Sequence, residues 1–359
     1  EPMLAESIEV LRGPSTLLYG GGAIGGVVNV LDNRVPTRRR DGMDGGAEYR
    51  HESASDLDNL VFRLDGGSGD FAFHASGLYR EWNDLEIPGK AERAHDDDHD
   101  HDADHDDDHE QEHGGEETTD GYIANTGGRT RSLTLGGSYH LESGFVGLAV
   151  SRLENEYGVP GHSHGHHEDE EHDEHDEHDE HEEHEEHDEV EHGEEDGGVR
   201  LDVEQTRYDL NGHWHEPFDA IEVMRAFITY TDYEHAEIEP GGEVGTRYEN
   251  ETWEGRLEMV HQTMGNFHGV FGLQATSGEF SAAGEEAFIP VTDSTEFGVF
   301  LVEDYHTDDW TFEGGLRIDW DERDPDSTAA QKQDFTAVSV SGSALWDING
   351  DWQLGLALA

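Results

Sequence analysis

The sequence predicts an all-β protein, a transmembrane antiparallel β-barrel, and three observations lead to this prediction. Apolar and polar residues alternate over segments longer than ten residues, whereas helical periodicity is nearly absent after residue 40. The apolar faces are rich in aromatic residues, as the two membrane interfaces of a barrel require. The connections alternate between short and long. Soluble sheets usually have strands of about five or six residues, whereas about ten tilted residues cross a bilayer.

The strand prediction is clearest near the end of the chain. Trp310, Leu316 and Trp320 fall on one face of an alternating segment, whereas Thr311 and Asp319 fall on the other. Aromatic residues stand at both ends of the apolar face. The same alternation recurs in residues 71–79, 133–139 and 352–358. Each of these segments is expected to form an amphipathic strand.

The lengths of the connections predict which of them share a rim of the barrel. Short connections are expected at residues 66–70, 141–144, 215–219, 263–266, 307–309 and 349–351, and long ones at 84–129, 156–199, 236–246, 281–293 and 321–334. Every second connection of an antiparallel meander lies at the same end, so the long loops share one rim. Membrane barrels of this kind have short periplasmic turns and longer extracellular loops. A soluble all-β domain is the alternative.

The composition excludes several classes of function. A formal net charge of -65 makes nucleic acid a poor partner. The chain has no cysteine, so only nitrogen and oxygen remain as metal donors. No run of about 18 apolar residues is present, which excludes a membrane-spanning helix but not a barrel. No Ser-His-Asp context, His-Glu-x-x-His motif or distinct carboxylate pair stands out, so neither an enzyme nor a catalytic cofactor is expected.

Histidine is concentrated in two acidic tracts, which hold 17 of the 26 histidines. Neutral imidazole is the commonest side-chain ligand of divalent transition metals, and carboxylates add oxygen donors. A purely solvated acidic run needs no histidine, so we expect tracts that are disordered and also bind metal. The predicted ligands are His95, His99, His101, His105, His109 and His113 in the first tract, and His162, His164, His166, His167, His172, His175, His178, His181, His184, His187 and His192 in the second.

Other histidines and a basic cluster are expected to have ordinary roles. Lumen, turn or interface positions are predicted for His74, His140, His213, His215, His235, His261, His268 and His306. A cluster of arginines at positions 34, 38, 39 and 40 is predicted to be a solvated junction rather than a binding patch.

The first forty residues differ in character from the rest of the chain. Glycines at positions 20, 21, 22, 25 and 26 suit tight turns, and Val27, Val28 and Val30 are expected to start a buried strand. No Gly-Lys-Ser/Thr follows these glycines, and their spacing fits no dinucleotide fingerprint. Nucleotide binding is therefore not expected.

The same region carries Ile8-Glu-Val-Leu-Arg-Gly-Pro14, then Leu18-Tyr-Gly20 and Ala23-Ile-Gly-Gly-Val-Val-Asn29. Together these segments resemble the end of the plug domain of TonB-dependent outer-membrane receptors. Residues 297–305 and 314–319 are similar to the paired mid-barrel strands of the same receptors. The resemblance implies a globular plug inside a 22-stranded barrel.

The resemblance also implies a division of the chain. Residues 1–40 would be the C-terminal end of the plug, and residues 41–359 the N-terminal half of the barrel with about half of its strands. The chain is then expected to be a fragment that lacks the N-terminal part of the plug and the C-terminal strands.

Three details are similar to zinc receptors of the ZnuD type. They are Asn29-Val-Leu-Asp-Asn-Arg-Val-Pro36, Tyr157-Gly-Val-Pro-Gly-His-Ser-His164 and Ala287-Phe-Ile-Pro290. This chain departs from that pattern because its loop has no cysteine and its tracts are far more acidic. Donor type alone does not separate zinc from copper or nickel.

The resemblance implies a receptor in the bacterial outer membrane, in contact with its lipid and energised by the TonB-ExbB-ExbD complex. The tracts would capture a divalent metal ion at the cell surface, and Zn²⁺ would be the transported ligand. One alternative is a receptor for a siderophore, a metallophore or another metal. A second alternative is a surface protein that sequesters metal without transporting it.

Overall fold

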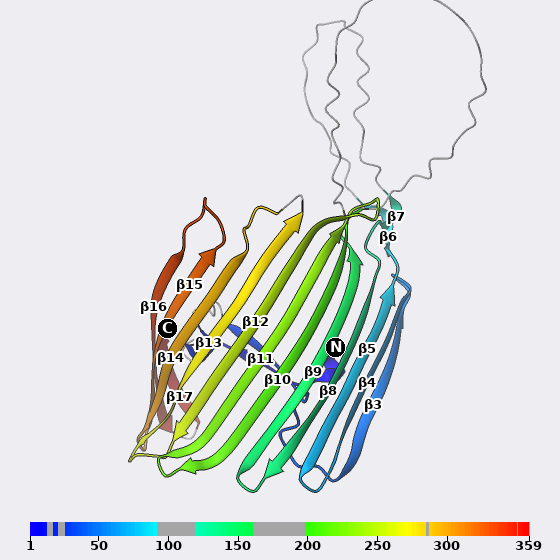
Figure 1. Cartoon of the computed structure of the whole chain (residues 1–359). Coiled ribbons are helices and arrows are strands. Elements are labelled where there is room, and N and C mark those ends of the chain that lie inside the picture. The colour runs from blue at the N-terminus through cyan, green and yellow to red at the C-terminus, as the bar shows by residue number, and fades with distance from the viewer. Residues whose placement is uncertain are drawn as a thin grey trace, which may run out of the picture.

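The computed structural model describes residues 1–12, 17–20, 26–91, 119–160, 198–284, 287–349 and 351–358. In these ranges it shows a 13-stranded antiparallel sheet and two sheets of two strands each (Figure 1). The large sheet is a meander in which β3, β4 and β5 are followed by β8 and then by every strand to β17. The predicted all-β fold is confirmed. None of the described helices is long and apolar enough to span a membrane.

The strands of the large sheet lengthen toward its middle, where β10 reaches 19 residues. A 3-10 turn, η1, covers Pro2–Leu4. The strands are β1 Ala5–Leu11, β2 Val27–Asp32, β3 Gly42–Glu52, β4 Leu57–Ser68, β5 Phe71–Trp82, β6 Leu85–Lys90, β7 Asp120–Ile123, β8 Gly128–Leu141, β9 Gly144–Gly158, β10 Arg200–Phe218, β11 Ile221–Ile238, β12 Val244–His261, β13 Phe267–Gly284, β14 Thr292–His306, β15 Trp310–Pro325, β16 Gln333–Asn349 and β17 Trp352–Leu358.

The connections alternate between the two ends of the sheet, as the sequence predicts (Figure 1). We call one end the short-turn rim; its turns are residues 69–70, 142–143, 219–220, 262–266, 307–309 and 350–351. The other end, the long-loop rim, carries the connections at 53–56, 159–199, 239–243, 285–291 and 326–332, and also the segment between β5 and β8. Both histidine tracts therefore belong to connections on the same rim.

Two details of the predicted connections are wrong. Residues 84–129 are not one irregular loop, because β6 and β7 form a separate two-stranded sheet within them. The last three long connections are shorter than expected, since β11 to β16 continue pairing through polar residues near the rim. Backbone hydrogen bonds extend a strand where the apolar alternation has already ended.

The large sheet is apolar on its outer face and polar on its inner face. In β15, Leu316 and Trp320 are 43% and 42% exposed, whereas Arg317 and Asp319 are buried. This reverses the pattern of a soluble sheet, which buries its apolar face. Exposed apolar residues continue across neighbouring strands, as with Leu148 at 57%. A continuous outward apolar band is what a lipid-facing barrel wall requires.

The apolar band covers only part of the length of the central strands. On β10 the outward residues Leu210 and Tyr208 lie toward the short-turn rim, and Glu204 and Asp202 follow toward the long-loop rim. Arg152 on β9 pairs with Glu204 on this outer face. Because about ten residues cross a bilayer, a strand of 19 residues projects well beyond it. The long-loop rim therefore stands above the membrane band.

The described part of the N-terminal segment, residues 1–12, 17–20 and 26–41, lies on the inner side of the sheet (Figure 1). Leu17 packs in a small core with Phe300, and Val35 packs with Phe145 and Ala149. The backbone of Arg34 approaches Gly136 of β8 so closely that a Cβ atom at position 136 would overlap the Arg34 carbonyl oxygen. The N-terminal segment is thus fixed to the wall at points far apart in the sheet.

Strands β1 and β2 pair with each other, not with the large sheet. The prediction of a strand at residue 27 is confirmed, but the prediction that it is buried is wrong, because Val28 and Val30 are 66% and 57% exposed. A two-stranded sheet has one face that no described segment covers. Gly20 and Gly26 have positive φ values of 107° and 134°, as tight turns require. The glycines at 21, 22 and 25 lie outside the described residues.

Candidate metal-capture site

The predicted ligands belong to two connections whose necks the structure describes. The histidines themselves, at positions 95 to 113 and 162 to 192, lie outside the described residues. What the structure places is the base of each tract. The site is therefore built from these necks.

The neck of the first tract is the hairpin of β6 and β7. Leu85 pairs with Ile123, and at the far end the amide of Ala91 donates to the carbonyl of Thr119 over 3.0 Å. This hydrogen bond closes the hairpin where the described residues end. The first tract is thus held between two paired strands.

The neck of the second tract is the end of the β9–β10 pair. Register pairs Gly158 with Arg200, and one step further the Val159 amide donates to the Val199 carbonyl over 2.9 Å. The two ends of this connection therefore leave the sheet side by side. A ladder of backbone bonds along β9 and β10 fixes their position.

Asn125 joins the two necks. Its side-chain nitrogen donates to the carbonyl oxygens of Val159 and Val199, at 3.0 and 2.8 Å. Asn125 has a positive φ of 55°, a conformation that asparagine adopts more readily than most residues. Gly158 permits the close approach, because a Cβ atom there would overlap the Asn125 side chain. The base of the β6–β7 hairpin is consequently joined to the base of the second connection on the long-loop rim.

Asp84 stabilises the turn that carries Asn125. Its Oδ1 accepts hydrogen bonds from the amides of Thr126 and Gly127, at 2.7 and 2.8 Å. The Trp82 indole donates to the Thr126 carbonyl over 2.8 Å. A carboxylate that accepts two backbone amides holds a turn firmly. The β6–β7 hairpin is therefore tied to the end of β5 and the start of β8.

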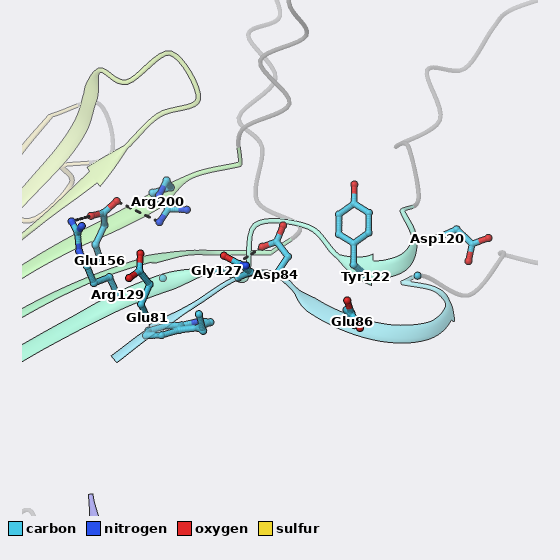
Figure 2. A pocket seen from close by; sticks show the side chains of 13 residues that line it. Glu81, Asp84, Glu86, Asp120, Tyr122, Gly127, Arg129, Glu156 and Arg200 are labelled. Carbon is cyan, nitrogen blue, oxygen red and sulfur yellow. Dashed lines mark hydrogen bonds and ion pairs between the residues drawn. The ribbon is translucent and has the colours of Figure 1, made fainter. Parts of the chain in front are cut away.

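A polar cleft of about 700 Å³ lies between the hairpin and the sheet (Figure 2). Glu156 accepts hydrogen bonds from Arg129 and Arg200, at 3.0 and 3.5 Å. Figure 2 shows this ion-paired group on one side of the cleft and Tyr122 with Asp120 on the other. Its acidic residues outnumber its two arginines and are Glu81, Asp84, Glu86, Asp120 and Glu156. The base of both tracts is therefore electronegative.

A second group of polar contacts fixes the Leu17–Tyr19 turn to the inner wall. Arg256 donates to the Leu18 carbonyl over 2.7 Å, and its guanidinium stacks on Phe300 at 4.6 Å. Arg317 lies 5.7 Å from the same ring and is paired with Asp319 at 2.7 Å. Charged side chains are satisfied in the interior here because each guanidinium has an acidic or carbonyl partner.

The expectation of a solvated arginine junction is wrong for Arg34. It pairs with Asp32 at 2.6 Å and with Asp209 of β10 at 3.3 Å. Burial opposes the charge of Arg34, but hydrogen bonding and attraction to Asp32 and then Asp209 raise its pKa above the usual value. Arg38 and Arg39 are exposed, as predicted. Arg34 is thus a tie between the N-terminal segment and the wall.

The structure contains a Ser-His-Asp hydrogen-bond chain that the sequence did not reveal. His74 Nδ1 lies 2.8 Å from Asp65 Oδ1, and its Nε2 lies 2.9 Å from Ser76 Oγ. Asn33 of the N-terminal segment also donates to Asp65, at 2.6 Å. All three members are buried in the wall, and none lines the cleft at the base of the tracts or the cavity that holds His213. This hydrogen-bonded group is structural, since it links β4, β5 and the N-terminal segment, and His74 has an ordinary interior role.

The remaining histidines have mostly local partners. His261 bonds Glu303 at 3.1 Å, His306 bonds Thr311 at 3.1 Å, and His235 stacks on Tyr248 at 4.5 Å. Among the described residues no group of three or more His, Asp or Glu side chains is arranged to hold a metal ion.

The family follows from this architecture and from sequence comparison. The family model described as "TonB dependent receptor-like, beta-barrel" matches residues 12–357. The chain therefore belongs to the TonB-dependent receptor β-barrel family, and it is a protein of the bacterial outer membrane. Under this placement the long-loop rim is the extracellular end of the barrel and the short-turn rim is the periplasmic end.

Curated relatives match only part of the chain. Over 80 residues the chain is 39% identical to the ferrienterobactin receptor of Escherichia coli (strain K12), which covers 21% of this chain and 10% of that receptor. Over 97 residues it is 34% identical to the ferric enterobactin receptor PirA of Pseudomonas aeruginosa, which covers 27% of this chain and 12% of that protein.

Solved structures match nearly the whole chain. The copper transporter OprC superposes with a TM-score of 0.68 at 13% identity, covering 97% of this chain and 49% of OprC. The FrpB iron transporter from Neisseria meningitidis, F5-1 variant, in its apoprotein form, gives 0.66 at 13% identity, covering 99% and 52%. At this identity the match shows a shared fold. The chain spans about half the length of these structures.

Proposed function

We propose that this chain is part of a TonB-dependent receptor that imports a divalent transition metal, with zinc as the preferred cargo. The observation that carries the proposal is the junction at Asn125. It places the necks of two histidine-rich connections, rooted 74 residues apart, within hydrogen-bonding distance of each other. The bases of the two histidine-rich connections are therefore neighbours on the extracellular rim. The predicted ligands remain the 17 histidines from His95 to His192.

Electrostatics support the capture of a cation at this rim. The cleft at the base of the tracts is acidic, and the outer wall beside it is rich in carboxylates. A negative surface raises the local concentration of divalent ions and speeds their association. Donors that must be ordered on binding give weak, exchangeable sites. Weak capture near the mouth of the barrel suits delivery to a tighter site deeper inside.

The N-terminal segment supports the transport step of the proposal. In this account, residues 1–40 are the end of a plug that closes the lumen, and residues 41–359 are the part of the barrel that surrounds it. The ties at Leu18, Arg34 and Val35 hold the plug end to the wall. Work from the TonB-ExbB-ExbD complex would then rearrange the rest of the plug. The choice of zinc rather than copper as the cargo rests on the resemblance to zinc receptors.

A second candidate cargo is a ferric siderophore. The observation that favours it is the local identity of 39% and 34% to two receptors whose names specify ferric enterobactin. In that case the histidine tracts would regulate uptake or attract metal ions to the surface, but the ions they bind would not be the cargo. The two candidates differ in which depleted nutrient the receptor restores.

The test is metal uptake into cells that express the complete receptor, with and without its energising partner. Radioactive zinc, nickel, copper and manganese are compared with ferric enterobactin. Zinc uptake that requires both the receptor and TonB supports the proposal. Uptake of ferric enterobactin with no uptake of any free metal replaces it with the siderophore alternative.

A further inference from the structure

A cavity of about 550 Å³ lies near the short-turn rim, at the opposite end of the sheet from the bases of the histidine tracts. It is enclosed by the inner face of the sheet and by residues 37–38, which link the N-terminal segment to β3. His213 and His215 of β10 line it together with His140, Glu142, Arg38 and Arg225. Neither histidine takes part in the ties that fix the N-terminal segment to the wall.

The alternation of β10 shows that both histidines point into the lumen. Asp209 on this strand reaches Arg34 of the N-terminal segment, so odd-numbered positions around it face inward. His213 and His215 lie on that same face, whereas Leu210 is exposed on the lipid side. Both side chains therefore face the lumen and are shielded from the membrane.

The two imidazoles have the separation of a shared metal ion. Their ring centroids are 4.6 Å apart, and the rings are inclined at 52°. Zn–N bonds are about 2.0–2.1 Å, so two imidazoles on one ion have ring centres about 5 Å apart. His213 Nε2 is buried and has no hydrogen-bond partner among the described residues. A buried nitrogen of this kind is costly unless something binds it.

The backbone holds the pair in place. The amide of His215 donates to the Ser143 carbonyl over 2.7 Å. The register with β11 then shifts between His215 and Phe218, and Glu216 has a positive φ of 49°. Bulges of this type re-aim side chains and occur often beside functional sites. The two histidines thus belong to the last residues of β10 that pair regularly with β11 before the short-turn rim.

The charges in the cavity are compatible with a cation. Arg225 is engaged by Glu258 at 3.4 Å, and Glu142 supplies a carboxylate to the same space. His140 is not part of the pair, because Phe145 lies between them with centroid distances of 5.5 Å to His140 and 5.8 Å to His213. Arg38 is the remaining cation, and it is exposed on the linker.

We infer that His213 and His215 form a two-imidazole site for a divalent transition metal on the periplasmic side of the lumen. Water completes the coordination. Two protein ligands give a weak site with open positions, which suits an ion that is passing through. The role as an exit station rests on the proposed import function, whereas the binding itself does not.

The test is histidine footprinting of the purified complete receptor in detergent. Diethyl pyrocarbonate modifies free imidazole nitrogens, and mass spectrometry reads the modification of His215, which is exposed. Zn²⁺ is titrated beyond the point at which the tract histidines are protected. We expect the rate of modification of His215 to fall several-fold, while His306 stays reactive. An unchanged rate at His215 overturns the inference.

Variants separate the pair from its surroundings. His213→Asn is expected to abolish zinc protection of His215, whereas His140→Asn in the same cavity leaves it intact. Far-UV circular dichroism and heat-modifiable mobility check that each variant is folded. His215→Asn, read at His213, repeats the test from the other side. Loss of protection in His140→Asn alone, or protection by inorganic phosphate and not by Zn²⁺, contradicts the site.

The same titration distinguishes this inference from the proposed function. Protection of the tracts without protection of His215 leaves metal capture standing and removes the periplasmic site. Protection of His215 without protection of the tracts does the reverse.

Discussion

The side-chain nitrogen of Asn125 lies 2.8 Å from the carbonyl oxygen of Val199, although 74 residues separate them in the sequence. The same amide nitrogen also donates to the carbonyl oxygen of Val159, so one side chain holds both strands of the second neck. The first tract begins and ends on the hairpin just before Asn125. The bases of the two histidine-rich connections are therefore held together on the long-loop rim.

Replacing Asn125 should loosen this junction. Asn125→Asp keeps the size and tolerates the positive φ, but removes the donor and sets a carboxylate against two carbonyl oxygens. We expect a loss of about 1 kcal/mol in local stability. Hydrogen exchange at the Val159 amide should become faster. Asn125→Gly, which relieves the backbone but also lacks the donor, should show the same change. Equal protection in both variants and the native chain would refute the junction.

Gly136 should be intolerant of a side chain. A Cβ atom there would overlap the backbone carbonyl of Arg34 and would also lie 3.1 Å from the Cβ atom of Ala149. Gly136→Ala should destabilise docking of the N-terminal segment by about 1–3 kcal/mol. Limited proteolysis should then cut within residues 26–41 more rapidly. Gly255→Ala is the matched control, because a Cβ atom at that position has nothing within 4 Å. Similar cleavage rates in both variants would contradict the close approach.

The outward apolar band predicts an asymmetry along β9 and β10. Leu148→Lys places a charge in the lipid-facing band and should destabilise the folded barrel by about 2–4 kcal/mol. Asp202→Lys should be tolerated, because it lies above the band among other acids. Urea unfolding in lipid vesicles measures both. A larger loss for Asp202→Lys would show that the band has been placed at the wrong height.

Metal binding by the tracts should depend on pH. Free imidazole has a pKa near 6.5, and neighbouring carboxylates favour its protonated form. Protons compete with the metal, so affinity is present at neutral pH and is lost as the pH falls through the imidazole pKa. We expect a sharp fall below about pH 6. Calorimetry of zinc binding to the purified chain measures this. A flat affinity across that range argues for carboxylate ligands.

Much of the fold could be predicted from the sequence because strand alternation has a period of two. Leu316 and Trp320 face outward and Arg317 inward, and the two rims follow from connection lengths alone. The exposure of Val28 and Val30 could not be predicted in this way. Alternation gives the face of a strand but not which segment covers that face.

The contacts between distant segments could not be predicted from the sequence for a different reason. Arg34 binds Asp209 and Asn125 binds Val199, and each partner is one of many similar residues in an acidic chain. Similarly, Asp65, His74 and Ser76 come together only through the register of β4 and β5. The sequence does single out the histidine tracts, since their density has no structural explanation. Their ligand geometry lies outside the described residues.

The central claim is that histidine at the extracellular rim feeds energised import of zinc. The most direct measurement is the initial rate of zinc uptake at limiting zinc, in cells with the complete receptor and with a variant in which the 17 tract histidines are asparagine. The acids stay unchanged, so net charge at neutral pH is matched. We predict that the native rate depends on TonB and that the variant loses most of it. Equal TonB-dependent uptake by both receptors would contradict the account.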